Sequence, residues 1–74
     1  MQEGHLSSLF KEMIYIAVSM TNSCEYCIRS HIKSAKLKGM DDEMLKELIA
    51  VVGMANETNS LVESYQVEVD ENLK

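Results

Sequence analysis

Apolar residues recur at helical spacing in three successive segments, and this periodicity restricts the chain to an all-α fold. The first segment spans about Ser8 to Met20, the second about Cys24 to Leu37, and the third begins after Asp41. In the third segment the apolar positions are Met44, Leu45, Leu48, Ile49, Val52 and Ala55. Apolar residues three and four positions apart form one face of a helix. The sequence therefore predicts a small bundle of three to four helices.

The length of the chain makes this bundle incomplete by itself. Its 74 residues allow a single domain over 1–74, and a core of that size rarely supplies more than about 3–5 kcal/mol. Yet 46% of the residues are hydrophobic, six are methionine and none is proline. Methionine fills irregular gaps in cores and adaptable interfaces. We expect homo-oligomerisation to complete the core; the alternative is a marginally stable three-helix monomer.

Polar residues and glycine mark the expected ends of the helices. Asn22, followed three residues later by Glu25, has the spacing of a capping box at the start of the second helix. Gly39 is expected to end that helix, and Asp41 to cap the third. The third helix is expected to continue to about Tyr65, with a possible kink over 56–59. The tail over 66–74 alternates valine with polar residues, and we expect it to lie extended against a neighbouring subunit.

The first helix combines apolar residues on more than one face with a single internal carboxylate. The apolar spread predicts that this helix is largely buried. Glu12 lies in its middle, where a carboxylate must find a partner or remain exposed. One interpretation places Glu12 with Lys11 in a narrow solvated strip. The other turns Glu12 inward to hydrogen-bond His31 and fix its tautomer. The sequence leaves both interpretations open.

Cys24 and Cys27 form a C-x-x-C motif at the expected start of the second helix. The positive end of the helix dipole stabilises a thiolate, which is the reactive form of cysteine. Residues three apart on a helix lie on the same side, so the pair can close a disulfide. His31 follows Cys27 by four residues and can serve as an acid or base. These groups are expected to point into packed protein.

Other interpretations of the cysteine pair also have to be weighed. Cys24, Cys27, His31 and His5 could in principle form a Cys2His2 zinc site, although His5 lies near the terminus. The cysteines could also pack as inert small hydrophobes. The chain would then be a non-catalytic acidic helical oligomer, or a redox- or metal-sensing module.

Charge and hydropathy exclude several classes of function. A formal net charge of −5 argues against nucleic-acid binding, which requires a basic surface. No run of 18 apolar residues predicts a membrane span, and the first residues lack the pattern of a signal peptide. We therefore expect a cytoplasmic protein. In a reducing compartment two cysteines are more often redox or metal groups than a structural disulfide.

The spacing of the polar residues resembles that of a known family. Glu12, eleven intervening residues, Cys24-x-x-Cys27 and then His31 four residues later are similar to the signature of the alkylhydroperoxidase D-like branch of the carboxymuconolactone decarboxylase superfamily. The flanking residues over 11–19 and 22–28, with Ala35 and Gly39, agree with it. The resemblance covers about residues 6–60.

This resemblance implies an all-α fold that assembles as a homotrimer or homohexamer. It also implies a thiol peroxidase in which one cysteine attacks the peroxide and the other resolves the product to a disulfide. Glu12 and His31 are then the proton relay. The reductant implied is an external dithiol of the lipoyl type carried by a partner protein, with no bound cofactor or metal. The motif leaves open which cysteine attacks.

Overall fold

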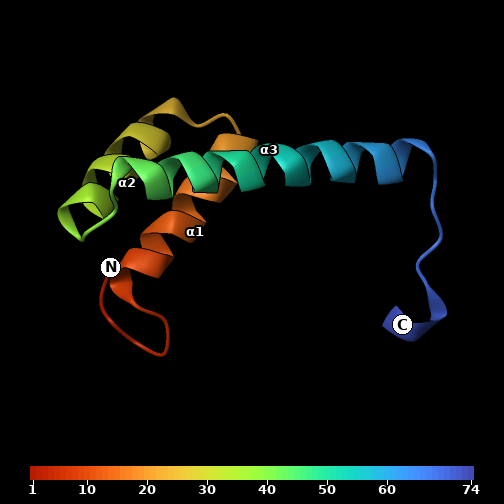
Figure 1. The fold of residues 1–74 in the computed structure, drawn as a ribbon, viewed down its shortest axis with the longest axis horizontal. Coiled ribbons are helices and arrows are strands. Elements are labelled where there is room, and N and C mark those ends of the chain that lie inside the picture. Colours follow the sequence, from red (N-terminus) through yellow and green to blue (C-terminus); the bar gives the residue numbers. More distant parts are fainter.

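Three α-helices and one short 3-10 turn make up the protein, and the structure contains no strand. A computed structural model describes all residues 1–74 (Figure 1). Helix α1 spans Ser8–Thr21, α2 spans Glu25–Leu37, α3 spans Asp42–Ser64, and the 3-10 turn η1 spans Glu71–Leu73. Helix α1 packs against both α2 and α3. The all-α class and the helix number predicted from the periodicity are confirmed.

Side-chain caps and one glycine set most of the helix ends. The Ser7 hydroxyl accepts a hydrogen bond from the backbone N–H of Phe10 at 3.0 Å and so begins α1. Asp41 Oδ1 accepts from the N–H of Met44 at 2.8 Å, which confirms its predicted capping role. Gly39 has a φ of 112° directly after the last residue of α2 and its cap. That left-handed conformation favours glycine and confirms the predicted stop.

The predicted capping box at the start of the second helix is wrong. Asn22 closes α1 instead, because its N–H bonds the Val18 carbonyl at 3.0 Å and continues the ladder of the first helix. Ser23 then adopts a φ of 57° and reverses the chain. The N-cap of α2 therefore falls on Cys24, two residues later than predicted. This shift places one cysteine of the C-x-x-C motif at the cap itself.

The core lies where α1 meets the last turns of α2 and the first turns of α3. Ile16 and Ala35 are fully buried, and Met40 is 3% exposed. Partly buried apolar residues surround these three: Leu9, Met13, Met20, Ile32, Met44, Leu45 and Leu48. This contact stabilises the α1–α2 hairpin, because burying apolar area contributes about 25 cal/mol per Å².

The expectation that α1 is largely buried is wrong within a single chain. Its buried residues are Ser8, Glu12, Ile16 and Ser19, which share one face. On the opposite face Phe10, Ile14 and Val18 are each 44–54% exposed. The reason is geometric, since α2 and α3 cover only one side of α1 in the single chain. The remaining apolar face has no covering element within the chain.

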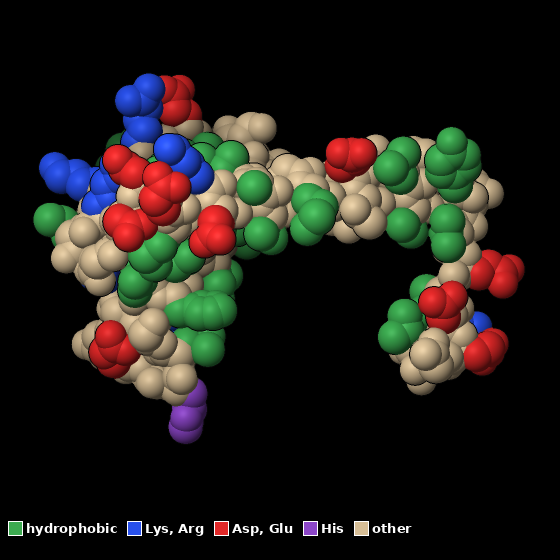
Figure 2. All heavy atoms as spheres, viewed as in Figure 1, with side chains coloured by type: hydrophobic (Ala, Val, Ile, Leu, Met, Phe, Trp, Pro, Cys, Tyr) green, Lys and Arg blue, Asp and Glu red, His purple; other side chains and the backbone are tan.

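Helix α3 is one continuous helix through 56–59, so the structure shows no interruption where a kink was considered. Its second half extends beyond α1 and α2 as an arm, and the tail turns back from its end (Figure 1). Apolar side chains lie exposed along this arm (Figure 2), among them Met54, Leu61, Val62 and Tyr65. The tail lies free of the bundle, with Val67 and Val69 exposed. None of the helices combines the length and the apolar character that a membrane crossing requires.

Candidate active site

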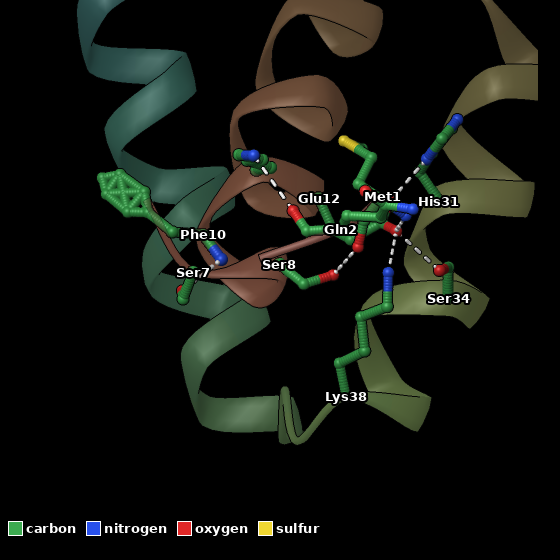
Figure 3. A network of polar contacts seen from close by, with 10 residues as sticks. Met1, Gln2, Ser7, Ser8, Phe10, Glu12, His31, Ser34 and Lys38 are labelled. Carbon is green, nitrogen blue, oxygen red and sulfur yellow. Dashed lines mark hydrogen bonds and ion pairs between the residues drawn. The ribbon is translucent and has the colours of Figure 1, made fainter. Parts of the chain in front are cut away.

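The Glu12 side chain turns inward from α1 and contacts His31 on α2. Glu12 Oε1 lies 2.6 Å from His31 Nδ1, and the carboxylate is only 2% exposed (Figure 3). The interpretation of Glu12 as part of a solvated strip is therefore excluded. Because an ionised carboxylate only accepts hydrogen bonds, Nδ1 carries the proton in this contact. The other ring nitrogen, Nε2, is therefore the one that can accept and release a proton.

Ser34 of α2 and Lys38, the C-cap residue of that helix, bind the second oxygen of the same carboxylate. Ser34 Oγ donates to Glu12 Oε2 at 2.7 Å, and Lys38 Nζ donates to it at 2.6 Å (Figure 3). The amino group of Met1 lies 3.8 Å from the same oxygen. Sequence reasoning missed Ser34 and Lys38, although they follow His31 by three and seven residues. That spacing places all three on one face of α2, and it is the signal that identifies them.

These donors lower the pKa of Glu12 to about 2. The hydrogen bond from His31 contributes most, followed by the one from Lys38, while burial acts in the opposite direction. In return, the Glu12 carboxylate raises the pKa of Lys38. A carboxyl group with so low a pKa stays ionised at every pH at which a thiol reacts. Glu12 is thus a permanent buried anion with a cation and two other donors around it.

Both cysteines are free thiols and are half-buried at the start of α2. A hydrogen bond from the Cys27 side chain lowers the pKa of Cys24, and the backbone N–H of Cys27 acts in the same direction. The same side-chain contact raises the pKa of Cys27. In the reduced pair, Cys24 is therefore the sulfur that more readily holds a negative charge. Its place at the N-cap of α2 favours that charge as well.

An open pocket of about 510 Å³ lies against both sulfur-bearing residues. Its lining is largely apolar and consists of Lys11, Ile14, Tyr15, Val18, Ser19, Asn22, Cys24 and Cys27. In the single chain the cysteines thus face a pocket, and not packed protein as the sequence predicted. Sequence reasoning also missed Tyr15, whose ring stacks on that of His31 with centroids 3.7 Å apart. Its position three residues after Glu12 on α1 is the signal that places it beside Glu12.

The structure assembles no group of three or more His, Cys, Asp and Glu side chains that could hold a metal ion. His5, which a Cys2His2 site would need, is exposed in the segment before α1. The structure instead brings an imidazole and a buried carboxylate together, and the imidazole lies on the helix that begins with the thiol pair. That combination suits thiol redox chemistry with proton transfer.

The fold and the site together define an all-helical protein with a C-x-x-C pair beside a Glu–His contact. The model of the carboxymuconolactone decarboxylase family matches residues 1–67, so the chain belongs to that family. The likeness to its alkylhydroperoxidase D-like members, expected from the sequence, is confirmed by a solved structure. The alkylhydroperoxidase AhpD core from Rhodospirillum rubrum superimposes with a TM-score of 0.94 at 46% identity.

The match to the Rhodospirillum rubrum protein covers 99% of this chain and 54% of that one. A second relative is the uncharacterized protein 4 in the cox locus of Paracoccus denitrificans, which is 35% identical over 49 residues. That match covers 66% of this chain and 44% of the relative. The chain thus spans about half the length of the proteins it resembles.

Proposed function

We propose that this chain is a thiol-dependent peroxidase that reduces organic hydroperoxides through Cys24 and Cys27. One observation carries the proposal: both cysteines line an apolar pocket at the start of α2, and His31 on the same helix is held by a buried carboxylate. An inert cysteine pair needs neither an accessible pocket nor an oriented imidazole. The likeness to the alkylhydroperoxidase AhpD core supports the same reaction.

The reaction begins when one cysteine, as a thiolate, attacks an oxygen of the hydroperoxide. The O–O bond breaks, the sulfur becomes a sulfenic acid, and the alkoxide leaves as an alcohol after taking up a proton. The second thiol then attacks the sulfenic sulfur, which forms the Cys24–Cys27 disulfide and releases water. An external dithiol reduces this disulfide by exchange and is itself oxidised to a disulfide.

His31 and Glu12 supply the proton transfers in this scheme. His31 Nε2 accepts a thiol proton and delivers it to the leaving oxygen. Glu12 binds Nδ1 at 2.6 Å, fixes the tautomer and stabilises the imidazolium. Tyr15 stacks on the imidazole and limits its rotation. Tyr15, which also lines the cysteine pocket, connects the His31 ring to that pocket.

The partners of this reaction follow from the proposed chemistry. We propose a lipoyl-type dithiol on a reductant protein, since a small apolar dithiol suits the pocket at the cysteines. We further propose a cytoplasmic homotrimer or homohexamer. The exposed apolar faces of α1 and of the α3 arm support assembly, because a single chain leaves them in contact with water.

Peroxide turnover with a series of reductants tests the proposal. We expect cumene hydroperoxide to be consumed with dihydrolipoamide, and more slowly with thioredoxin or glutathione. Cys24→Ser and Cys27→Ser should both abolish turnover. Only the variant that retains the attacking sulfur should accumulate a sulfenic acid, which mass spectrometry detects after trapping with dimedone.

Two results would contradict the proposal. Both single variants could react with peroxide as fast as wild type, at the rate of an ordinary free thiol. The chain would then be a non-catalytic oligomer with the fold of its family. Release of a bound metal on oxidation, without turnover, would favour a sensing module.

A further inference from the structure

We infer that Lys38 and Ser34 are positioning residues that hold Glu12 as a fixed anion, so that His31 alone carries the proton during peroxide reduction. The inference rests on the proposed peroxidase function and deepens it. It revises the Glu–His relay: Glu12 orients and stabilises, but takes up no proton. The observation behind the inference is that donors from α2 and from its C-cap residue Lys38 bind both oxygens of one buried carboxylate.

The two oxygens of Glu12 have separate tasks. Oε1 binds only His31, whereas Oε2 binds the Ser34 hydroxyl at 2.7 Å and the Lys38 ammonium at 2.6 Å. The carboxylate cannot rotate without breaking all three contacts, and bonds to an ionised group are among the strongest in proteins. Ser34 and Lys38 thus lock the plane in which Oε1 meets the imidazole.

The surroundings distinguish this pair from an ordinary surface ion pair. Lys36 lies two residues away on the same helix and pairs with Asp42 at 3.4 Å, with side chains 48% and 78% exposed. Water screens such a pair, which contributes little. Lys38 is 29% exposed and its partner Glu12 only 2%. The Lys38–Glu12 contact is therefore shorter and far better shielded.

The charges around Glu12 determine where the thiol proton can go. From α2 the carboxylate faces His31 and Lys38, and from the N-terminal segment it faces the Met1 amino group at 3.8 Å. The charge of Glu3 raises the pKa of Lys38. No charged group of α3 forms an ion pair with Glu12. The charged residues of α3 that form ion pairs are Asp42, which pairs with Lys36, and Glu43, which pairs with Lys46.

This surplus of donors makes Glu12 a poor base, since its pKa is lowered to about 2. The proton that leaves a cysteine S–H therefore stays on His31 Nε2 as an imidazolium. It passes from Nε2 to the alkoxide oxygen when the O–O bond breaks, and His31 returns to its neutral form. Glu12 is ionised before, during and after the cycle.

Lys38→Met, with Lys36→Met as its matched control, tests the inference. The first readout is the titration of the Glu12 carboxyl carbon by NMR, which needs no turnover. Without the Lys38 cation we expect the midpoint of Glu12 to rise by about 1 pH unit, and Lys36→Met to leave it unchanged. Lys38→Arg should restore the wild-type midpoint. Ser34→Ala should raise the Glu12 midpoint by less than Lys38→Met does. If Lys38→Met does not fold, Ser34→Ala is the variant that tests the inference.

The second readout is peroxide turnover between pH 3 and pH 8, relative to wild type at each pH. Lys38→Met should lose activity most at the acid end, where Glu12 now takes up a proton. We expect about a twofold greater loss near pH 3 than at pH 8, because a midpoint raised by about 1 pH unit from about 2 leaves half of the Glu12 carboxyls protonated near pH 3. A role in folding alone lowers the rate by the same factor at every pH, so that result overturns the inference. An unmoved Glu12 midpoint also overturns it. If the Glu12 midpoint rises in Lys38→Met but the wild-type protein shows no peroxide turnover, the positioning role of Lys38 is supported and the proposed peroxidase function is refuted.

Discussion

Substitution of Glu12 by glutamine is the most direct test of the network that joins α1 to α2. The change keeps the size and shape of the side chain but removes its charge. One acceptor oxygen becomes an NH2 donor, His31 and Lys38 lose the negative charge between them, and a buried amide takes the place of a carboxylate that is 2% exposed. We expect a less stable protein whose stability depends less on pH.

The magnitude follows from the pKa of Glu12. Its value in the folded protein is about 2, against 4.5 for an unperturbed glutamate. One pKa unit corresponds to 1.36 kcal/mol, so the ionised carboxylate contributes about 3 kcal/mol to folding. Because the folded pKa is lowered, this contribution is complete above pH 4.5. It is lost progressively as the pH falls from there toward pH 2.

Urea unfolding of wild type and Glu12→Gln at pH values from 2 to 7 measures this contribution, at a fixed protein concentration. The difference between the two free energies of unfolding should shrink by about 3 kcal/mol between pH 5 and pH 2. Glu25→Gln is the matched control, since Glu25 pairs with Arg29 at 3.1 Å on an exposed surface. It should cost less than about 1 kcal/mol. A difference between wild type and Glu12→Gln that stays constant over this range would refute the reasoning.

Three further predictions concern packing, capping and assembly. Ile16→Ala should lower the free energy of unfolding by about 2–5 kcal/mol, because Ile16 is fully buried between the helices; a cost near zero in urea unfolding would contradict the assigned core. Asp41→Ala should cost about 1 kcal/mol in the same assay, since Asp41 Oδ1 caps α3, while Asp41→Asn should cost less. Light scattering should find at least three chains per particle, because 46% hydrophobic residues leave more apolar surface than one chain can cover; a stable folded monomer at micromolar concentration would rule this out.

Local sequence patterns located most of the helical framework. Asp41 and Gly39 mark their boundaries through chemistry that acts within a few residues, a side-chain cap and a left-handed φ of 112°. The start of α2 was misplaced because Asn22 could serve either as the C-cap of α1 or as the N-cap of α2. Asn22 extends the ladder of α1, which the spacing of Asn22 and Glu25 could not reveal. Local rules thus fail where one helix directly follows another.

The sequence predicted the residues of the candidate site that lie on one helix, but not the contact between that helix and α1. Cys24, Cys27 and His31 lie on one helix, so their spacing alone predicts that they are neighbours. The partner of Glu12 was undecided, because Glu12 belongs to another helix and the packing angle between helices is not encoded in spacing. The structure decides it with a contact of 2.6 Å.

The sequence by itself determined the helix class, the cysteine pair with its histidine, and an apolar content too large for one small core. These depend on periodicity and composition, which are local or additive properties of the chain. Only the tertiary structure decided that α2 crosses α1 where Ser34 and Lys38 reach the Glu12 carboxylate. It also decided that Tyr15 stacks on His31 beside the pocket. The reason is that such contacts join residues 16 to 26 positions apart, and helix packing brings them together.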